Sequence, residues 1–302
     1  RLNYKSILKK NNSFVKIKRI FKIRRILIQE KIDLILAFVE GCYWNALLAA
    51  VFTKIKIIAL ERTSPQRFEY ISLKKYKLII MNLFRFAHKI TVQFPSYKDI
   101  YPSYLHKKIN VIPNAVSTIN LKKDCFDKKE KIILCVGRTC FQKNLKSLIK
   151  AFSLIKNKKG WKLFLITDNK DHEITKLIKD LDLEKDTKVI KPLSDISNFY
   201  LKASIFCLPS YYEGFPNALA EAMSFGLACV GFNECSGVNE LIINNETGLL
   251  ANGINNAKNL KKVIYVLMNN SQLRMKLALN ARKFISSYSK KEIYQKWDEI
   301  IS

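Results

Sequence analysis

The chain is poor in glycine, histidine and long apolar segments. Only 9 of its 302 residues are glycine, 3 are histidine and 7 are cysteine. No uninterrupted apolar run approaches the roughly 18 residues that a helix needs to cross a bilayer. The histidines, His88, His106 and His172, are scattered, and no two cysteines form a C-x-x-C pair. These shortages argue against a membrane-spanning helix within these residues and against a metal centre.

A disulfide framework is not expected either. The number of cysteines is odd, and Cys135, Cys207 and Cys229 fall within apolar runs. We therefore expect reduced thiols in a hydrophobic core, as is typical of a cytosolic protein. The hydrophobic fraction of 48% is that of a globular protein, and 302 residues are enough for two domains.

Acidic residues are also scarce. The chain has 25 of them against 53 lysines and arginines, which gives a formal net charge of +28. Residues 1–120 hold 23 basic and 6 acidic residues, a net charge of +17. This excess favours partners with phosphate groups or an anionic surface, whether nucleic acid, acidic lipid or nucleotide. It is equally compatible with a lysine-rich but otherwise ordinary soluble protein.

A basic helix is expected near the start of the chain. Within residues 15–30, Ile20, Ile23 and Leu27 keep helical spacing. Basic residues occupy much of the remainder, namely Lys16, Lys18, Arg19, Lys22, Arg24 and Arg25. Such a helix can lie on an anionic membrane, and it can equally cover a sheet with its charged face in solvent.

Short apolar segments alternate with helix-like segments along the chain. The segments of strand length are 33–38, 55–60, 90–94, 109–112, 132–136, 161–166, 188–190, 205–208 and 228–232. The segments with a helical pattern are 15–30, 45–52, 73–86, one that ends near 155, 257–268, 271–285 and 290–301. This alternation predicts an α/β protein with parallel sheets covered by helices on both faces.

A charged segment divides this alternation into two series. Residues 120–131 (NLKKDCFDKKEK) are poor in large apolar residues and are the best candidate for a linker. We expect two Rossmann-like, doubly wound domains facing a cleft, with residues 1–126 in the first and 127–302 in the second. The last helix, about 289–302, is expected to pack back on the first domain. Ligands of such sheets bind beyond the carboxyl ends of the strands.

One stretch, residues 213–226 (EGFPNALAEAMSFG), combines a helix start with two carboxylates. Gly214, Phe215 and Pro216 lead into good helix formers from Asn217 onward, and Gly226 stands where the helix is expected to stop. The first N–H groups of a helix that follows a strand favour a phosphate group. Two glutamates, Glu213 and Glu221, flank this helix start, and neither has an evident cationic partner within four residues.

A second stretch, residues 137–143 (GRTCFQK), supplies cations at the end of another strand. Gly137 allows a sharp turn, and Arg138 and Lys143 place two positive charges at the same sheet edge. A diphosphate suits these residue types, since arginine offers a fork of donors and lysine a point charge. The G-x-x-x-x-G-K-[ST] pattern of a P-loop is absent. Taken alone, two such cations are most often solvated surface charges.

Together these residues resemble glycosyltransferase family 4, the retaining, nucleotide-sugar-dependent transferases with the B-type glycosyltransferase fold. The resemblance rests on VGR followed by Lys143, on PSYYEGFPNALAEAMSFG with its two glutamates, on SGVNELI and on NETGLLA. It covers the second domain fully and the first more loosely, through ERTSP and VIPNAV. The combination of motifs is specific, although no single one is.

The resemblance implies a role for each motif residue. Arg138 and Lys143 are expected to hold the donor diphosphate, Glu213 to lie beside the transferred sugar, and Glu221 to bind the ribose hydroxyls. Further donor contacts are expected from Gly137, Gly214, Phe215, Pro216 and Asn217, and from Leu193 for the base. On the acceptor side the resemblance points, more weakly, to Glu61 and Arg62. No metal or other cofactor is expected, because the two cations stand where a divalent ion acts elsewhere.

The first domain departs from the family pattern. Members of the family begin with a strand and a glycine-rich loop near the donor phosphates, whereas this chain opens on Arg1. We therefore expect an N-terminally incomplete chain and an incomplete first domain. Many relatives also have a histidine where this chain has Arg62, which bears on the acceptor-side assignment.

The expected function is transfer of a sugar from a nucleotide-diphosphate sugar to a glycan or lipid-linked acceptor, in the assembly of surface polysaccharide or lipopolysaccharide. The expected location is cytoplasmic, with peripheral contact to the anionic inner face of the membrane. Alternatives are a nucleotide-sugar epimerase on the same fold, an inactive donor-binding relative, a glycosidase with two catalytic carboxylates, and a basic nucleic-acid-binding protein. No nucleic acid partner is expected, because the aromatic residues do not gather into a basic platform for single strands.

Overall fold

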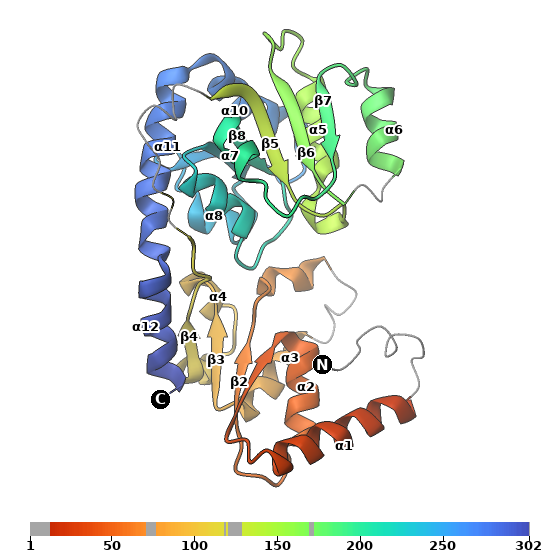
Figure 1. Cartoon of the computed structure of the whole chain (residues 1–302), viewed down its shortest axis with the longest axis vertical. Helices are drawn as coiled ribbons and strands as arrows, with labels where there is room; N and C mark the ends of the chain where they lie inside the picture. Colours follow the sequence, from red (N-terminus) through yellow and green to blue (C-terminus); the bar gives the residue numbers. More distant parts are fainter. Residues whose placement is uncertain (1–12, 71–76, 118, 120–128, 169–171, 302) are drawn as a thin grey trace. The chain divides into compact units, whose positions relative to one another are not determined.

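The computed structural model describes residues 13–70, 77–117, 119, 129–168 and 172–301 (Figure 1). The chain divides into two compact units, Arg1–Ile112 and Pro113–Ser302. Most of the predicted linker, and with it the predicted boundary between residues 126 and 127, lies outside the described residues.

The first unit contains a parallel sheet of four strands in the order β1-β2-β3-β4. The strands are β1 (Leu34–Phe38), β2 (Lys56–Leu60), β3 (Lys89–Val92) and β4 (Ile109–Val111). Its α-helices are α1 (Ser13–Gln29), α2 (Val39–Ala49), α3 (Lys77–Leu83) and α4 (Pro95–Lys98). Ile58 of β2 and Ile90 of β3 are fully buried, as expected for inner strands of a sheet covered on both faces.

Helix α1 confirms the basic helix that the sequence predicts. Leu27 is buried, and Arg24 donates hydrogen bonds to the carbonyls of Ala49 (3.0 Å) and Val51 (2.6 Å), which tie α1 to the end of α2. The opposite face is exposed, and its apolar residues include Phe21 at 67% exposure. None of the helices in the described part of the chain combines the length and the apolar character that a membrane crossing requires.

The prediction for α2 was wrong at its start. The sequence pattern predicts a helix over 45–52, but α2 begins at Val39, immediately after β1. Val39 has a φ of 56°, so the chain turns from strand to helix within one residue that is not a glycine. The segment that begins α2 contains Gly41, a poor helix former, and therefore gives little helical signal of its own.

The predicted helix at 73–86 starts within residues that are not described; α3 is followed by a 3₁₀ turn, Phe84–Phe86.

The second unit contains a parallel sheet of six strands in the order β10-β9-β8-β5-β6-β7. The strands are β5 (Glu130–Val136), β6 (Lys162–Ile166), β7 (Thr187–Ile190), β8 (Ala203–Leu208), β9 (Ala228–Phe232) and β10 (Gly248–Ala251). Numbered from β5, this order is 3-2-1-4-5-6 read from β7, the doubly wound arrangement of a dinucleotide-binding domain. Every residue of β8 and β9 is buried. The prediction of a Rossmann-like second domain is confirmed.

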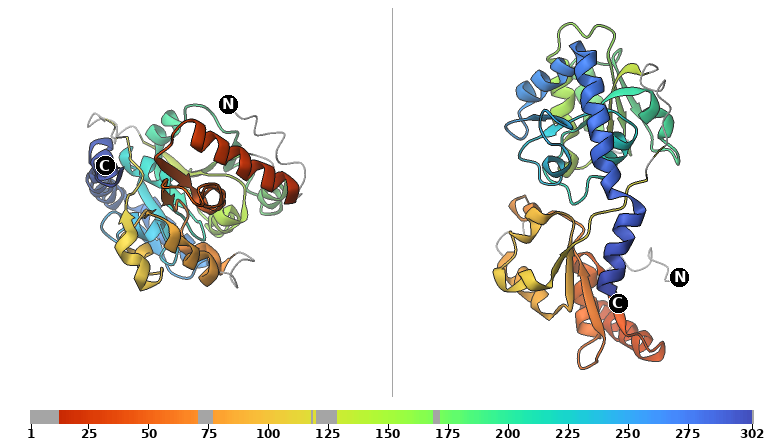
Figure 2. Two further views of the ribbon diagram at one scale, coloured as in Figure 1. Left: turned by 90° about the horizontal axis from the view of Figure 1, so that it is seen from below. Right: turned by 90° about the vertical axis from the view of Figure 1, so that its left-hand side faces the viewer.

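Helices cover this sheet on both faces (Figures 1 and 2). They are α5 (Leu145–Ser153), α6 (His172–Asp180), α7 (Ser197–Lys202), α8 (Asn217–Ser224), α9 (Val238–Leu241), α10 (Ala257–Asn269) and α11 (Ser271–Ile285). Helix α12 (Lys290–Ile301) follows α11 and does not cover this sheet. Helix α5 packs against α6 and α10, while α8 packs against α11. The connections run outward from β5 in one direction and from β8 in the other, so the two strands that begin the two directions lie side by side.

Helix α8 ends as its sequence predicts. Gly226 has a φ of 66°, and its N–H donates to the carbonyl of Met223 (3.0 Å). The next N–H, of Leu227, reaches back to the carbonyl of Ala222 (3.0 Å). This pair of hydrogen bonds satisfies the last carbonyls of the helix and requires a left-handed residue at position 226.

We expect Gly226→Ala to lower the free energy of unfolding by about 1 kcal/mol, because an alanine in the left-handed region clashes with its own backbone. Thermal or urea unfolding followed by circular dichroism measures the change. Gly41→Ala is the matched control: Gly41 is helical and no atom lies within 4 Å of an added Cβ. That variant should be unchanged or more stable, and an equal loss in both would contradict the assignment.

Candidate functional site

The two predicted site loops follow the two adjacent strands at which the sheet reverses its winding. Residues 137–144 follow β5 and residues 209–216 follow β8. Because all strands of the sheet are parallel, both loops emerge at its carboxyl edge. In open α/β sheets this reversal point is where ligands bind. The structure therefore brings the GRTCFQK and EGFPN motifs together within one unit.

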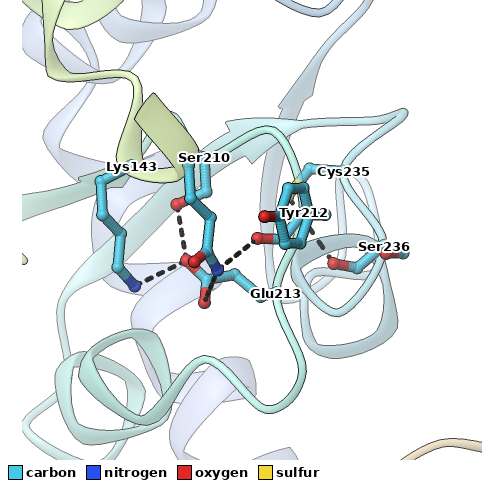
Figure 3. Close-up of polar contacts among 7 residues, drawn as sticks. Lys143, Ser210, Tyr212, Glu213, Cys235 and Ser236 are labelled. Atoms are coloured by element: carbon cyan, nitrogen blue, oxygen red, sulfur yellow. Dashed lines mark hydrogen bonds and ion pairs between the residues drawn. The ribbon is translucent and has the colours of Figure 1, made fainter. Parts of the chain in front are cut away.

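The carboxylate of Glu213 is the centre of this site (Figure 3). Lys143 Nζ lies 2.7 Å from its Oε1 atom, and Ser210 Oγ donates to the same oxygen at 2.6 Å. Gln142 Nε2 lies 3.4 Å from the second oxygen, Oε2. Glu213 is 5% exposed, so its charge is largely removed from water and needs these partners. The sequence shows no cationic partner for Glu213 within four residues; in the structure its partner is Lys143, 70 residues earlier in the chain.

Two hydrogen bonds to main-chain carbonyls join the two loops. The N–H of Tyr211 donates to the carbonyl of Gln142 at 2.9 Å, and Gln142 Nε2 donates to the carbonyl of Tyr212 at 2.9 Å. The ring of Phe141 stacks on that of Tyr211, with centroids 4.6 Å apart and planes inclined by 14°. The short 3₁₀ turn Phe141–Lys143 is thus fixed to the segment that precedes Glu213.

A third loop holds the main chain of Glu213. The N–H of Glu213 donates to the carbonyl of Ser236 at 2.8 Å, in the SGVNELI segment that follows β9. Figure 3 shows Ser236 and its neighbour Cys235 beside Tyr212 and Glu213. Cys235 is fully buried, and burial raises the pKa of its thiol well above the usual value, so it remains protonated. Loops that follow three neighbouring strands of the sheet, β5, β8 and β9, therefore position Glu213.

Gly137 makes room for the lysine. A Cβ atom built on Gly137 would lie 3.3 Å from Cδ of Lys143 and 3.4 Å from its Cγ. The aliphatic stem of Lys143 therefore lies against the main chain at position 137. A larger residue there would require the stem to shift by a few tenths of an ångström. Gly137 contributes through this close approach and not through a positive φ.

Arg138 differs from Lys143 in its surroundings. Its side chain is exposed, and its guanidinium makes no hydrogen bond or ion pair with any residue that the structure describes. The loop that carries it is anchored at the next residue, because the N–H of Thr139 donates to Oδ1 of Asp168 at 2.7 Å. This bond is also the main reason why the pKa of Asp168 lies below its usual value. Arg138 is thus a solvated cation on an anchored loop.

Glu221 lies in the middle of α8, and its side chain is exposed. Its Oε2 atom accepts a hydrogen bond from the hydroxyl of Tyr200 at 2.9 Å. No hydrogen bond joins it to Glu213. The two glutamates therefore have different environments: one is buried beside a lysine, and the other is exposed beside a phenol.

The residues between the two glutamates form a tight entry to α8. Pro216 is the N-cap residue, and its carbonyl accepts hydrogen bonds from the N–H groups of Leu219 and Ala220, each at 3.0 Å. Phe215 is 6% exposed. Asn217, the first helical residue, accepts a hydrogen bond from Nδ2 of Asn114 at 2.9 Å, which links the VIPNAV motif to this entry. Gly214 completes the entry.

Leu193 and the acceptor-side pair belong to other elements of the chain. Leu193 follows β7, two strands from β5 in the sheet, and is 53% exposed. In the first unit, Glu61 is 3% exposed and accepts from Arg67 (2.8 Å) and from the Tyr101 hydroxyl (3.2 Å). Arg62 donates to the carbonyl of Ile112 at 3.0 Å, and burial lowers its pKa. The Glu61 carboxylate therefore belongs to a buried ion pair.

Sequence reasoning missed four residues that hold Glu213, Glu221 or the GRTCFQK loop in place. Ser210 and Gln142 lie inside the recognised motifs, three residues before Glu213 and one before Lys143, but carried no assignment. Tyr200 lies outside the motifs, on the helix that precedes β8. Thr139 anchors its loop through main-chain geometry that a residue type does not reveal. The only available signal was that Ser210 and Gln142 are polar residues within the recognised motifs.

We expect Lys143→Met to lower the free energy of unfolding by about 3 kcal/mol, because it leaves the Glu213 carboxylate buried without a counter-charge. Adding Glu213→Gln to this variant should recover much of the loss. Lys202→Met is the control, since Lys202 pairs with Glu130 at 3.6 Å on the surface, with both side chains more than half exposed. Equal losses for Lys143→Met and Lys202→Met in urea unfolding would contradict the importance of the buried pair.

The sequence of this chain is similar to those of known glycosyltransferases. An uncharacterized glycosyltransferase of Haemophilus influenzae is 33% identical over 198 residues, which cover 65% of this chain and 56% of that relative. The chain thus spans little more than half the length of that relative. The GalNAc-alpha-(1->4)-GalNAc-alpha-(1->3)-diNAcBac-PP-undecaprenol alpha-1,4-N-acetyl-D-galactosaminyltransferase of Campylobacter jejuni is 24% identical over 289 residues, 94% of this chain and 79% of the relative.

Among solved structures, Anabaena HepE in complex with UDP and glucose superimposes with a TM-score of 0.81 at 18% identity, covering 97% of this chain and 84% of HepE. At this identity the likeness establishes the fold, which is the B-type glycosyltransferase fold of two Rossmann-like units. The family model described as "Glycosyl transferases group 1" matches residues 117–284, more than half of the chain and nearly all of the second unit. The chain therefore belongs to the group 1 glycosyltransferases.

Proposed function

We propose that this protein transfers a sugar from a nucleotide-diphosphate sugar to a glycan or lipid-linked acceptor, with retention of the anomeric configuration. The observation that carries the proposal is the buried Lys143–Glu213 pair at the reversal point of the second sheet, with the exposed Arg138 on the same loop. The retaining stereochemistry rests on the resemblance of the two motifs to family 4.

The reaction separates charge in a way that suits these residues. When the bond between the anomeric carbon and the diphosphate breaks, negative charge grows on the leaving oxygen and the sugar becomes cation-like. Fixed cations beside that oxygen, and a carboxylate beside the sugar, stabilise the transition state more than the ground state. Arg138 and Lys143 supply the cations in this proposal, and Glu213 supplies the carboxylate.

Lys143 can serve both partners. An ammonium group has three N–H donors, and one of them points to Glu213 at 2.7 Å. Two donors remain for phosphate oxygens without breaking the ion pair. Lys143 would then link the group that receives negative charge to the carboxylate that faces the sugar. The hydrogen bond from Ser210 keeps the Glu213 carboxylate in place while charge moves.

The remaining contacts to the donor come from α8, from the residues that precede it and from the region of Leu193 in this proposal. The carboxylate of Glu221 is exposed and charge-assisted hydrogen bonds from ribose hydroxyls to it are strong. The main chain at Gly214, Phe215, Pro216 and Asn217 would contact sugar and phosphate, and that near Leu193 the base. We propose no metal cofactor, because Arg138 and Lys143 provide the positive charge that a divalent ion supplies in other transferases.

The proposed acceptor is a glycan on a lipid carrier. The name of the Campylobacter jejuni relative describes transfer to an undecaprenol-linked glycan, and this chain aligns with 79% of that relative. The strongly basic helix α1 fits such an acceptor, since it would hold the enzyme at an anionic membrane surface. We therefore propose a cytoplasmic protein in peripheral contact with the inner face of the membrane, active in the assembly of surface polysaccharide and not on nucleic acid.

A donor screen tests the central proposal. The full-length enzyme is incubated with a panel of nucleotide sugars and a lipid-linked glycan acceptor, and release of nucleoside diphosphate is scored with and without EDTA. We expect release from one donor or a few, undiminished by EDTA, and a product whose anomeric configuration, read by NMR, equals that of the donor. Release without acceptor transfer, or isomerisation of the donor sugar, would favour an epimerase instead.

We expect Arg138→Ala to cost about 3–4 kcal/mol of transition-state stabilisation, the range for losing one preorganised electrostatic donor. This corresponds to a fall of roughly 10²–10³-fold in kcat/KM. Lys150→Ala is the control, because Lys150 is an exposed cation on α5 outside both site loops. Unchanged turnover in Arg138→Ala would remove this residue from the mechanism.

We expect the protein to bind anionic liposomes at low salt through α1. The triple variant Lys16→Gln, Lys22→Gln, Arg25→Gln should weaken binding by about 3 kcal/mol, since each cation near an anionic surface contributes about 1 kcal/mol. Its control carries the same charge change on the second unit, at Lys150, Lys176 and Lys258, all exposed. Equal losses in the two triple variants in a co-sedimentation assay would rule out α1 as the contact.

A gel shift at physiological salt checks the expected lack of nucleic acid binding.

A further inference from the structure

Tyr200 is a buried residue that the proposed mechanism has not used. It lies on α7 and is 1% exposed. Its ring stacks on that of Phe225, with centroids 5.2 Å apart and planes inclined by 19°, and lies 6.1 Å from the ring of Phe206. These contacts fix the direction of the ring, and with it the position of the hydroxyl at the inner side of α8.

The hydroxyl of Tyr200 reaches two acceptors on α8. It lies 2.9 Å from Oε2 of Glu221 and 3.3 Å from the carbonyl oxygen of Ala218. A phenol has a single proton to donate, and the shorter distance and the charge of the carboxylate both favour Glu221. Burial, followed by the charge of Glu221, raises the pKa of Tyr200 far above its usual value. The hydroxyl therefore stays protonated and acts as a donor at any working pH.

This hydrogen bond restrains a side chain that would otherwise move. A glutamate on a helix surface has several rotamers of similar energy, and a ligand that needs one of them must stop this motion on binding. With Oε2 held by Tyr200, the carboxylate keeps one orientation before the ligand arrives. Among the residues that the structure describes, none donates to Oε1, so this oxygen and the remaining lone pair of Oε2 are available.

We propose that Tyr200 is a positioning residue for recognition of the donor ribose, holding the Glu221 carboxylate so that it accepts both ribose hydroxyls. This inference rests on the proposed function, in which Glu221 binds the ribose. It adds a residue outside the recognised motifs, on α7, which carries none of the residues assigned to the diphosphate or the sugar. Tyr200 acts through Glu221 alone, so its effect should vanish for a nucleotide that lacks ribose hydroxyls.

Titration calorimetry with paired nucleotides tests this proposal. The full-length protein is titrated with UDP, ADP, GDP and CDP, each against its 2′,3′-dideoxy analogue, in the wild type and in Tyr200→Phe. For the nucleotide that the wild type binds, we expect Tyr200→Phe to weaken the ribonucleotide by about two- to tenfold, the effect of releasing one ordered side chain. Affinity for the dideoxy analogue should stay at the wild-type value.

Two further variants separate positioning from folding. Glu221→Ala should reduce the preference for ribonucleotide over dideoxynucleotide more than Tyr200→Phe does, and the double variant should lose no more than Glu221→Ala. Tyr43→Phe is the matched control: Tyr43 is fully buried in the first unit and donates to the carbonyl of Leu83 at 3.0 Å. It removes a buried tyrosine hydroxyl of the same kind and should leave both nucleotide affinities unchanged.

The outcomes are distinct. If Tyr200→Phe weakens both nucleotides of a pair equally, or leaves their ratio at the wild-type value while Glu221→Ala lowers it, the positioning role is wrong and the ribose role of Glu221 stands. If Glu221→Ala also leaves the ratio unchanged, or if the wild type binds no nucleoside diphosphate, the proposed function itself fails and the role of Tyr200 fails with it.

Discussion

The ion pair between the Lys143 ammonium and the Glu213 carboxylate is the interaction on which the site depends. A carboxylate that is 5% exposed is costly unless a counter-charge and further donors satisfy it. Both are present: Lys143 and Ser210 share one oxygen and Gln142 lies beside the other. The strand order makes this contact possible, because the reversal point of the sheet places the ends of β5 and β8 next to each other.

The two glutamates of the EGFPN stretch illustrate how environment assigns a role. They are eight positions apart and read alike in the sequence. Glu213 is buried against a cation, which suits a fixed negative charge that faces a reacting centre. Glu221 is exposed and held by the neutral hydroxyl of Tyr200, which suits reversible acceptance of hydrogen bonds from a ligand. Neither environment requires the glycosidase arrangement, in which the two carboxyl groups act on opposite sides of one bond.

Much of the fold could be predicted from the sequence. The alternation of apolar and helical segments gave the α/β class and most strand positions, and α8 and α11 begin and end where caps and composition indicate. The start of α2 could not be predicted, because Val39 adopts a backbone conformation that its residue type disfavours. Motif residues such as Lys143 and Glu213 could be identified, but their contact could not, since it spans 70 residues and depends on strand order. Tyr200 gave no signal at all, because its role arises from packing between α7 and α8.

The wide sequence separation within the site also bears on how it forms during synthesis. A ribosome delivers the chain from its N-terminal end, so Lys143 emerges 70 residues before the carboxylate that it pairs with. Strands β5 to β7 are complete before β8 exists, yet β5 pairs with β8 in the finished sheet. Until β8 and the loop after it are synthesised, one edge of β5 has no neighbouring strand and Lys143 has no Glu213 to pair with. Pairing of β8 with β5 therefore joins the two halves of the sheet and brings the segment that carries Glu213 beside the loop that carries Lys143.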